Sequence, residues 1–377
     1  MQWRAQVTHE IHTMEFEFKQ PLLTLKPVAG HFDSLEWRDG TLRGHGWLFA
    51  LGKRPESATL FVNGQAVGVV RPESRPDVEE ACRWANDSQP LGFRFELSNA
   101  ALAPKRVDVV AISNKRPIGR LSSYVLQPQD RELPLPPSAL AERVSGVSGE
   151  HFLVQGLKMF TDLTDVFLRY GIPTTGQLLD WGCGCGRVAR YFLSRLPAFR
   201  LTGCDIDPEA IEWCGENLPG GVFLKVKLSP PTPFEDNTFQ VILACSVLTH
   251  LDREAQAAWL AEIQRLLAPG GYFLASTNAE FAYRLKHPDV RPTGWRRWLE
   301  RVVGTSRAPG LLRDIDDSMP DPNMRWFVPE TVYRMVFQPK RYTVQLCSRY
   351  LRVVAYVPCG LDGFQDLIVC QKPKTGV

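Results

Sequence analysis

The chain has 377 residues, 44% of them hydrophobic and 23% charged, which is ordinary for a globular protein and enough for two domains with separate cores. Its 44 Lys and Arg against 41 Asp and Glu give a net charge of +3, too even a balance for a dedicated nucleic-acid binder. No apolar run approaches the roughly 18 residues that span a bilayer, and the charged N-terminus lacks the apolar core of a signal peptide. We therefore expect a cytoplasmic protein with no transmembrane segment and no nucleic-acid partner.

Residues 1–130 contain short alternating runs that predict β-strands. These runs cover residues 14–18, 46–49, 58–62, 66–70, 92–97 and 107–111. Asn63-Gly64 lies between two of them and is a strong signal for a two-residue hairpin turn. The spacing predicts a small antiparallel β-sandwich over residues 1–130, in which Arg75-Pro76-Asp77 forms a structural ion pair or a helix cap.

Residues 131–150 are rich in Pro, Ser and Gly and predict a linker. From residue 151 the apolar period becomes helical, and Gly171-Ile172-Pro173 ends the predicted helix. A second domain is therefore expected over residues 151–377.

The segment LLDWGCGCGRVARYFL begins at Leu178 and predicts a buried strand, a glycine turn and a helix. The turn contains Gly182, Gly184 and Gly186, which leave the backbone open to a ligand. A dinucleotide fingerprint needs a sixth-position glycine where Arg187 stands, and Asp180 before the turn would repel a pyrophosphate. Asp180 favours instead a ligand with an ammonium and a sulfonium, which describes S-adenosylmethionine.

The next predicted strand, residues 201–204, ends at Asp205. This carboxylate follows the glycine turn by the ~20 residues expected of an acid that binds ribose hydroxyls. Ile206 is then expected against the adenine, and Asp207-Pro208 predicts a helix N-cap.

These segments resemble class I S-adenosylmethionine-dependent methyltransferases, and the resemblance covers roughly residues 150–372. It implies a doubly wound, seven-stranded Rossmann-like α/β fold that binds S-adenosyl-L-methionine. It places Gly182, Cys183, Gly184 and Gly186 at the cofactor and implies that the preceding helix folds over it, with Phe152 and Gln155 as the lid. Cys183 and Cys185 are small residues between glycines, because no second cysteine pair accompanies them as a zinc site requires. We expect reduced thiols and no metal.

Residues 229–251 resemble the family's motif IV, whose strand end and following loop face the transferred methyl group. This implies that Ser246 contacts the cofactor. His250 closes the motif and is either a general base or a structural residue that caps the next helix. Two departures are Gln240, where family members commonly have Asp, and Lys227-Leu228-Ser229, which lacks the acid that meets adenine.

An expected insert over residues 281–330 combines aromatic and arginine side chains on the acceptor side, and aromatic faces with arginines suit a sugar or a phosphorylated glycan. Its members are Tyr283, Arg284, Lys286, His287, Arg291, Trp295, Arg296, Arg297, Trp298, Arg301 and Trp326. Beyond it, residues 342–346, 351–357 and 366–369 predict strands, with a hairpin turn at Leu361-Asp362-Gly363.

The N-terminal half resembles β-rich accessory domains of bacterial surface-glycan biosynthesis enzymes, through residues 44–47, 60–68, 75–78 and 92–97. Together the two resemblances imply a methyltransferase that acts on an oxygen or nitrogen acceptor, which is a small molecule or a bacterial glycan or glycolipid precursor in polysaccharide biosynthesis. A small-metabolite or protein methyltransferase, a non-catalytic S-adenosylmethionine-binding module and, more distantly, an NAD-dependent oxidoreductase are the alternatives. The oligomeric state is left open.

Overall fold

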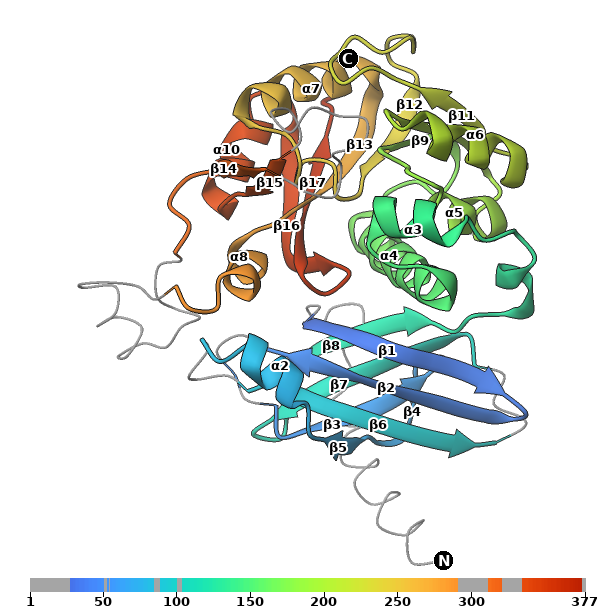
Figure 1. Cartoon of the computed structure of the whole chain (residues 1–377), viewed down its shortest axis with the longest axis vertical. Coiled ribbons are helices and arrows are strands. Elements are labelled where there is room, and N and C mark those ends of the chain that lie inside the picture. The colour runs from blue at the N-terminus through green and yellow to red at the C-terminus, as the bar shows by residue number, and fades with distance from the viewer. Residues whose placement is uncertain are drawn as a thin grey trace, which may run out of the picture. The chain divides into compact units, whose positions relative to one another are not determined.

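The computed structural model describes residues 28–50, 53, 55–84, 89–99, 104–290, 311–320 and 334–374 (Figure 1). The chain forms two compact units. The first comprises Met1–Gln127, Arg284–Leu311 and Asp362–Phe364, and the second comprises Pro128–Tyr283, Leu312–Leu361 and Gln365–Val377. Among the described helices, none has both the length and the apolar character that crossing a bilayer requires.

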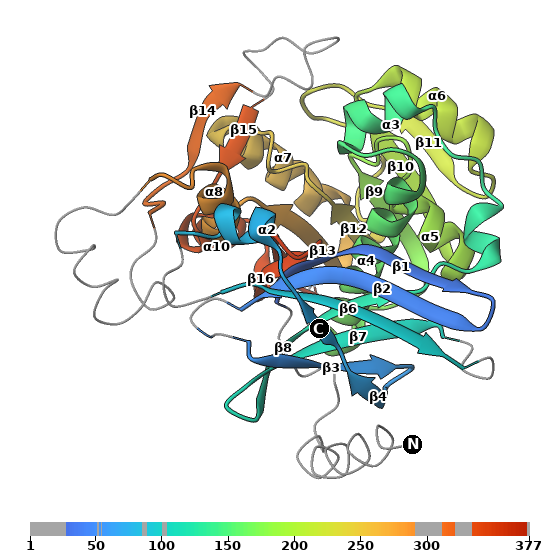
Figure 2. The same ribbon diagram turned by 60° about the horizontal axis from the view of Figure 1, so that its bottom comes forward.

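The first unit contains two four-stranded antiparallel sheets (Figure 2). One sheet has the order β1-β2-β6-β5 and the other the order β4-β3-β7-β8. The strands are β1 (Ala29–Arg38), β2 (Thr41–Phe49), β3 (Ser57–Val62), β4 (Gln65–Val69), β5 (Arg71–Glu73), β6 (Leu91–Ser98), β7 (Arg106–Ser113) and β8 (Arg116–Tyr124). Five of the six predicted runs fall on these strands, and the run at residues 14–18 lies outside the described residues.

Both sheets contribute to one apolar core. Phe32, Leu48 and Phe93 of one sheet and Leu60 and Val109 of the other belong to a single buried cluster. Alternation along each strand turns these side chains to the same face, and their removal from water stabilises the unit.

The turns of the first unit are as predicted. Asn63 and Gly64 take φ values of 51° and 81°, so the predicted tight turn joins β3 to β4. Arg75 forms ion pairs with Asp33 and Asp77 just before α2 (Pro76–Ala81), which confirms a structural role.

The second unit contains one seven-stranded sheet in the order β11-β10-β9-β12-β13-β17-β16. Its strands are β9 (Gly176–Trp181), β10 (Phe199–Asp205), β11 (Val222–Lys225), β12 (Phe239–Ala244), β13 (Leu267–Thr277), β16 (Arg352–Leu361) and β17 (Gln365–Gln371). The first five run parallel, and β17 is antiparallel to both β13 and β16. The strand order reverses between β9 and β12, where sheets of this kind bind ligands at the carboxyl ends of their strands.

Helices cover both faces of this sheet. They are α3 (Ser138–Ser145), α4 (Gly149–Tyr170), α5 (Ala189–Arg195), α6 (Pro208–Asn217), α7 (Arg253–Leu266) and α10 (Lys340–Cys347), while α8 (Glu280–Lys286) leads away from β13. Trp259 of α7 and Leu346 of α10 pack in one cluster with Leu179 and Phe273 of the sheet. The α4 helix ends as predicted, because Gly171 takes the left-handed conformation.

A predicted strand in the second unit is wrong. Residues 342–346 belong to α10, because Tyr342, Thr343, Leu346 and Cys347 are buried at helical spacing, although the same residues also show an alternating pattern.

The expected linker also contains ordered structure. It includes α3, whose Leu140 and Ala141 are buried, so residues from Pro128 onward belong to the second unit. The broader prediction of an α/β region preceded by a β-rich one is confirmed.

The insert is described only in part. Trp295, Trp298 and Trp326, with Arg291, Arg296, Arg297 and Arg301, lie outside the described residues. Within them, β14 (Asp316–Pro320) pairs with β15 (Arg334–Phe337), and Tyr283 packs edge-on against Phe337 at 5.3 Å between ring centroids.

Candidate active site

A cavity of about 150 Å³ lies at the carboxyl ends of β9, β10 and β12, where the strand order reverses. Gly182, Asp205, Ile206, Ser246 and His250 line it, so the structure brings together five residues that the sequence predicted for one site. They come from three strand-to-helix connections that are far apart in the chain.

The glycine turn is tightly packed. Gly182, Gly184 and Gly186 take φ values of 75°, 53° and 75°, which side chains rarely tolerate. A Cβ at Gly184 would collide with Val144 of α3, and a Cβ at Gly182 would collide with Val247. The turn therefore requires glycine for both its conformation and its close contacts.

Asp180, at the end of β9, is a buried carboxylate with only 2% of its surface exposed. Its Oδ2 has no hydrogen-bond partner among the described residues. Burial, and secondly the charge of Asp205, raises the pKa of Asp180 to about 7, while Arg187 opposes the change. An unpaired buried carboxylate of this kind favours a cationic partner.

Asp205 is held by the backbone around the glycine turn. Its Oδ2 accepts a hydrogen bond from Gly184 N at 2.8 Å, and its Oδ1 accepts one from Asp207 N at 2.9 Å. Burial raises the pKa of Asp205 in spite of these bonds. Because each carboxylate oxygen has about two acceptor positions, both oxygens can also accept from vicinal hydroxyls of a ligand.

The neighbouring Asp207 has a different role. Its Oδ1 accepts from Glu209 N at 3.0 Å, which caps α6, and its Oδ2 accepts from Arg143 at 2.7 Å. The prediction that Asp207 is a cap is confirmed.

One wall of the cavity consists of apolar side chains, most of which the sequence did not indicate as site residues. Ile206 is joined there by Val226, Leu228, Leu251 and Trp259. Trp259 donates to the Leu228 carbonyl at 3.2 Å. Trp259 is a buried residue of α7, and nothing in the local sequence indicates that the same ring also lines a cavity.

Ser246 follows β12 in an unusual conformation, with a φ of 61°. Its backbone N–H donates to Ser276 Oγ at 2.7 Å, and its hydroxyl donates to Gln365 Oε1 at 3.1 Å. These bonds fix the loop that carries both Ser246 and His250.

His250 contacts the backbone of β15. Its Nδ1 lies 3.1 Å from the Arg334 carbonyl, and Arg334 N donates to the His250 carbonyl at 3.1 Å. Because a carbonyl only accepts, the neutral ring bonded to it carries its proton on Nδ1 and has its basic lone pair on Nε2. This arrangement is compatible with a general base and also with a structural residue.

Phe152 lies away from the cavity lining. Its side chain is fully buried in a cluster with Cys185 and Ala210, and Gln155 accepts a hydrogen bond from Arg187 at 2.6 Å. Phe152 therefore supports the glycine turn through Cys185, and a lid role for it stays a hypothesis.

The cysteines beside the glycines are also buried. Cys183 and Cys185 have 6% and 0% of their surfaces exposed, and all nine cysteines lie within the described residues and are free. Among the described residues, no group of three His, Cys, Asp or Glu side chains is suited to a metal ion.

Gln240, which stands where family members commonly have Asp, lies at the end of the sheet opposite to the cavity. Its Oε1 accepts a hydrogen bond from Gln177 N, near the start of β9, at 2.7 Å. Gln240 therefore links two strands at their amino ends, and its difference from the family pattern leaves the cavity residues unchanged.

Comparison with known proteins identifies the region that carries this site. Residues 178–271 match the family described as methyltransferase domain. A phthiotriol/phenolphthiotriol dimycocerosates methyltransferase of Mycobacterium tuberculosis is 35% identical over 144 residues, which are 36% of this chain and 50% of that protein. A fatty-acid O-methyltransferase of Mycolicibacterium smegmatis is 32% identical over 100 residues, 26% of this chain and 35% of that protein.

Solved structures of similar description also match. A 1,6-didemethyltoxoflavin-N1-methyltransferase of Burkholderia thailandensis, with bound S-adenosylhomocysteine, is 16% identical with a TM-score of 0.39 and covers 71% of this chain and 96% of its own. The chain spans 36% to 54% of the length of the first mycobacterial relatives that it matches. Residues 178–271 therefore match a methyltransferase domain, and S-adenosylmethionine is supported as the cofactor of this region.

Proposed function

We propose that this protein transfers a methyl group from S-adenosylmethionine to an oxygen or nitrogen acceptor, through a seven-stranded methyltransferase domain preceded by a β-sandwich accessory domain. One observation supports the proposal most strongly. Gly182 of the glycine turn lines a cavity at the reversal of strand order, and the buried Asp180 and the partly buried Asp205, both with raised pKa values, lie beside the turn. These residues suit the amino group and ribose of S-adenosylmethionine better than the phosphates of a dinucleotide.

Each of these residues is proposed to bind one part of the cofactor. Asp180 would pair with the ammonium group of the cofactor, the two oxygens of Asp205 would accept from its ribose hydroxyls, and Ile206 with Leu228 would enclose its adenine. When bound, the cofactor supplies an electrophilic methyl group. The protein then contributes proximity and alignment, which are sufficient for in-line displacement.

His250 is the proposed general base. Its Nε2 accepts the acceptor's proton as the nucleophile attacks, and the contact between Nδ1 and the Arg334 carbonyl holds the ring in the required tautomer. His250→Gln keeps a polar side chain and is expected to lower turnover about 100-fold or more. The affinity for S-adenosylhomocysteine should change little.

Turnover measured from pH 5.5 to 9 tests this role for His250. His151→Gln, at an exposed position of α4, is the matched control and should leave turnover unchanged. Wild-type turnover and an unchanged pH profile for His250→Gln would assign His250 to loop structure alone.

The proposed acceptor is a lipid or glycolipid precursor. The relatives named for phthiotriol dimycocerosates and for fatty acids support the lipid part, and the resemblance of the N-terminal half to glycan-biosynthesis accessory domains supports the sugar part. A small metabolite or a protein side chain remains the alternative acceptor.

Two experiments test the function. Calorimetry with S-adenosylhomocysteine should show binding and the same titration with NAD should show none, and the reverse result would exclude a methyl-donor site. Methyl-labelled cofactor should then label lipid or glycolipid fractions. Cofactor binding without labelled product from lipid, glycan, metabolite or protein fractions would instead identify a non-catalytic binding module.

A further inference from the structure

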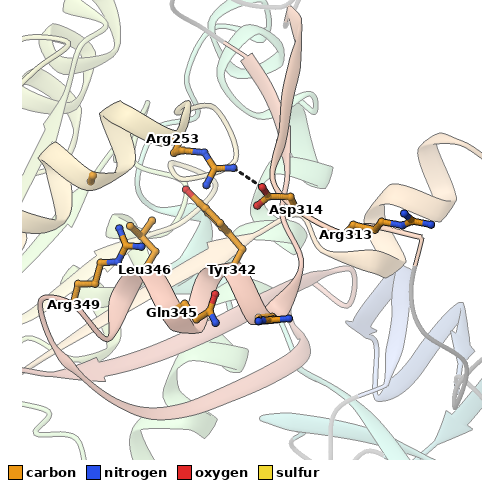
Figure 3. A pocket seen from close by; sticks show the side chains of 9 residues that line it. Arg253, Arg313, Asp314, Tyr342, Gln345, Leu346 and Arg349 are labelled. Carbon is orange, nitrogen blue, oxygen red and sulfur yellow. Dashed lines mark hydrogen bonds and ion pairs between the residues drawn. The ribbon is translucent and has the colours of Figure 1, made fainter.

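A second and larger cavity lies on the other side of the first turns of α7. Its volume is about 350 Å³, and four arginines line it: Arg253, Arg313, Arg341 and Arg349 (Figure 3). This volume falls within the roughly 300–1,000 Å³ typical of small-molecule sites. Among the described residues, Asp314 supplies the one carboxylate of the lining, so this part of the chain gives the cavity an excess of positive charge.

Arg341 and Gln345 lie on one side of α10, and Arg349 follows the last residue of that helix by two positions. Arg341, Gln345 and Arg349 follow one another at intervals of four, and the bond from Arg349 N to Leu346 O continues the helical path past Cys347. All three side chains are exposed. Within the part of the chain that the structure describes, neither Arg341 nor Arg349 forms an ion pair, so both guanidinium groups are available to a ligand.

Arg253 is held in place at the opposite wall. Its guanidinium lies 4.9 Å from the centroid of the Tyr342 ring, and its Nη2 donates to Asp314 Oδ2 at 2.9 Å. Figure 3 shows the side chains of Arg253 and Tyr342 directed toward one another and that of Arg313 extending outward. A guanidinium fixed on a ring and a carboxylate loses little freedom when it binds an anion.

Tyr342 adds a neutral donor. Its hydroxyl is buried and has no hydrogen-bond partner among the described residues. Burial raises the pKa of Tyr342 to about 12, so the hydroxyl keeps its proton at neutral pH. Because an unpaired buried hydroxyl is costly, a ligand oxygen that accepts from it would be stabilised. Ala257 and Leu346 complete an apolar wall.

We propose that this cavity binds a phosphate monoester. The dianionic phosphate accepts from the guanidinium groups of Arg253, Arg341 and Arg349, and the organic part of the ester lies against Ala257 and Leu346. A small soluble ester and the headgroup of a phosphorylated lipid share this chemistry. The site is independent of the cofactor assignment, since Arg253 and Ala257 of α7 line it while Ala255 and Trp259 of the same helix line the proposed cofactor cavity.

Two titrations at constant ionic strength distinguish the sources. Glycerol 1-phosphate is titrated by calorimetry, with glycerol and with sodium chloride as controls, and sedimentation measures binding to phosphatidylcholine vesicles with and without phosphatidic acid. Saturable binding of the soluble ester identifies a metabolite site, and binding only to phosphatidic acid vesicles identifies a headgroup site. Binding in neither titration overturns the proposal.

Variants test where the ligand binds. The double substitution Arg341→Gln and Arg349→Gln should weaken phosphate ester binding at least about tenfold. Tyr342→Phe should weaken it less, because it removes only one neutral donor. Arg200→Gln changes an exposed arginine of β10 and is the matched control. Wild-type ester affinity in the double variant overturns the proposal. Unchanged S-adenosylhomocysteine affinity in the same variant shows that the protein is folded, so a loss of ester binding can be distinguished from a failure of the proposed function.

Discussion

Asp180→Asn is expected to weaken S-adenosylhomocysteine binding by about 100-fold, because it removes one partner of the buried charge pair proposed with the ligand's ammonium group. The carboxylate is 2% exposed and its Oδ2 has no partner among the described residues, so a cationic ligand group would supply the missing interaction. Calorimetry measures the loss directly. Glu212→Gln, at an exposed position of α6, removes a carboxylate outside the cavity and should leave the affinity unchanged.

The same carboxylate is expected to make S-adenosylhomocysteine binding dependent on pH. The pKa of Asp180 is raised to about 7 in the ligand-free protein, and a cation binds its ionised form. Affinity should therefore fall as the pH decreases below about 7, by up to about tenfold for each pH unit. The Asn variant should lose the part of this dependence that Asp180 causes. A wild-type affinity that is constant from pH 5.5 to 8 would contradict the assignment.

Asp180→Asn should weaken ligand binding but increase the stability of the ligand-free protein. A carboxyl group whose folded-state pKa is raised stabilises the fold below its usual pKa, and this contribution is lost as the pH rises to about 7. The difference between the usual pKa of 3.8 and the raised pKa of about 7 corresponds to about 4 kcal/mol of stability that wild type loses above pH 7. The asparagine variant avoids this loss, but its buried amide would itself cost roughly 1–3 kcal/mol. At pH 8 the ligand-free variant should therefore be about 1–3 kcal/mol more stable than wild type in urea unfolding. A loss of stability would show that Asp180 is already paired.

Gly184→Val is expected to weaken S-adenosylhomocysteine binding by at least about 100-fold while the fold is retained. Gly184 has a φ of 53°, and a Cβ there would collide with Val144. The turn would have to move, and with it the Gly184 N–H that donates to Asp205. The variant should therefore disturb the backbone and the position of the Asp205 carboxylate together.

Calorimetry and circular dichroism check this prediction. Gly215→Ala is the matched control, because Gly215 lies in α6 with open space around it and without a positive φ. It should bind normally and gain about 0.5–1 kcal/mol of stability. If Gly184→Val also binds normally, the glycine turn has no role at the cofactor.

Much of the proposed donor site could be predicted from sequence because its signals are local. The strand, glycine turn and helix around Gly184, the acid one strand later and the cap at Asp207 each depend on a few consecutive residues. Asp180 and Asp205 each stand at the end of a predicted parallel strand, so the sequence predicts that both lie at the same edge of the sheet. The structure places Asp205 in the cavity lining and Asp180 buried beside it, and their ligand roles stay predictions.

Other features could not be predicted because they depend on contacts between distant segments. The helix α10 contains an alternating apolar pattern that predicted a strand, and only packing against β16 and β17 selects the helix. Leu228, Leu251 and Trp259 meet in one wall although each resembles an ordinary core residue in sequence.

The sequence by itself determined the strands and helices around the glycine turn, the turn itself and the residue types suited to S-adenosylmethionine, because these follow from backbone preferences and charge over short distances. Only the tertiary structure decided which carboxylate is unpaired, how His250 meets the Arg334 carbonyl and where four arginines surround a second cavity. Burial, pKa and charge balance depend on every neighbour in space, and residues up to 96 positions apart, Arg253 and Arg349, contribute to a single cavity.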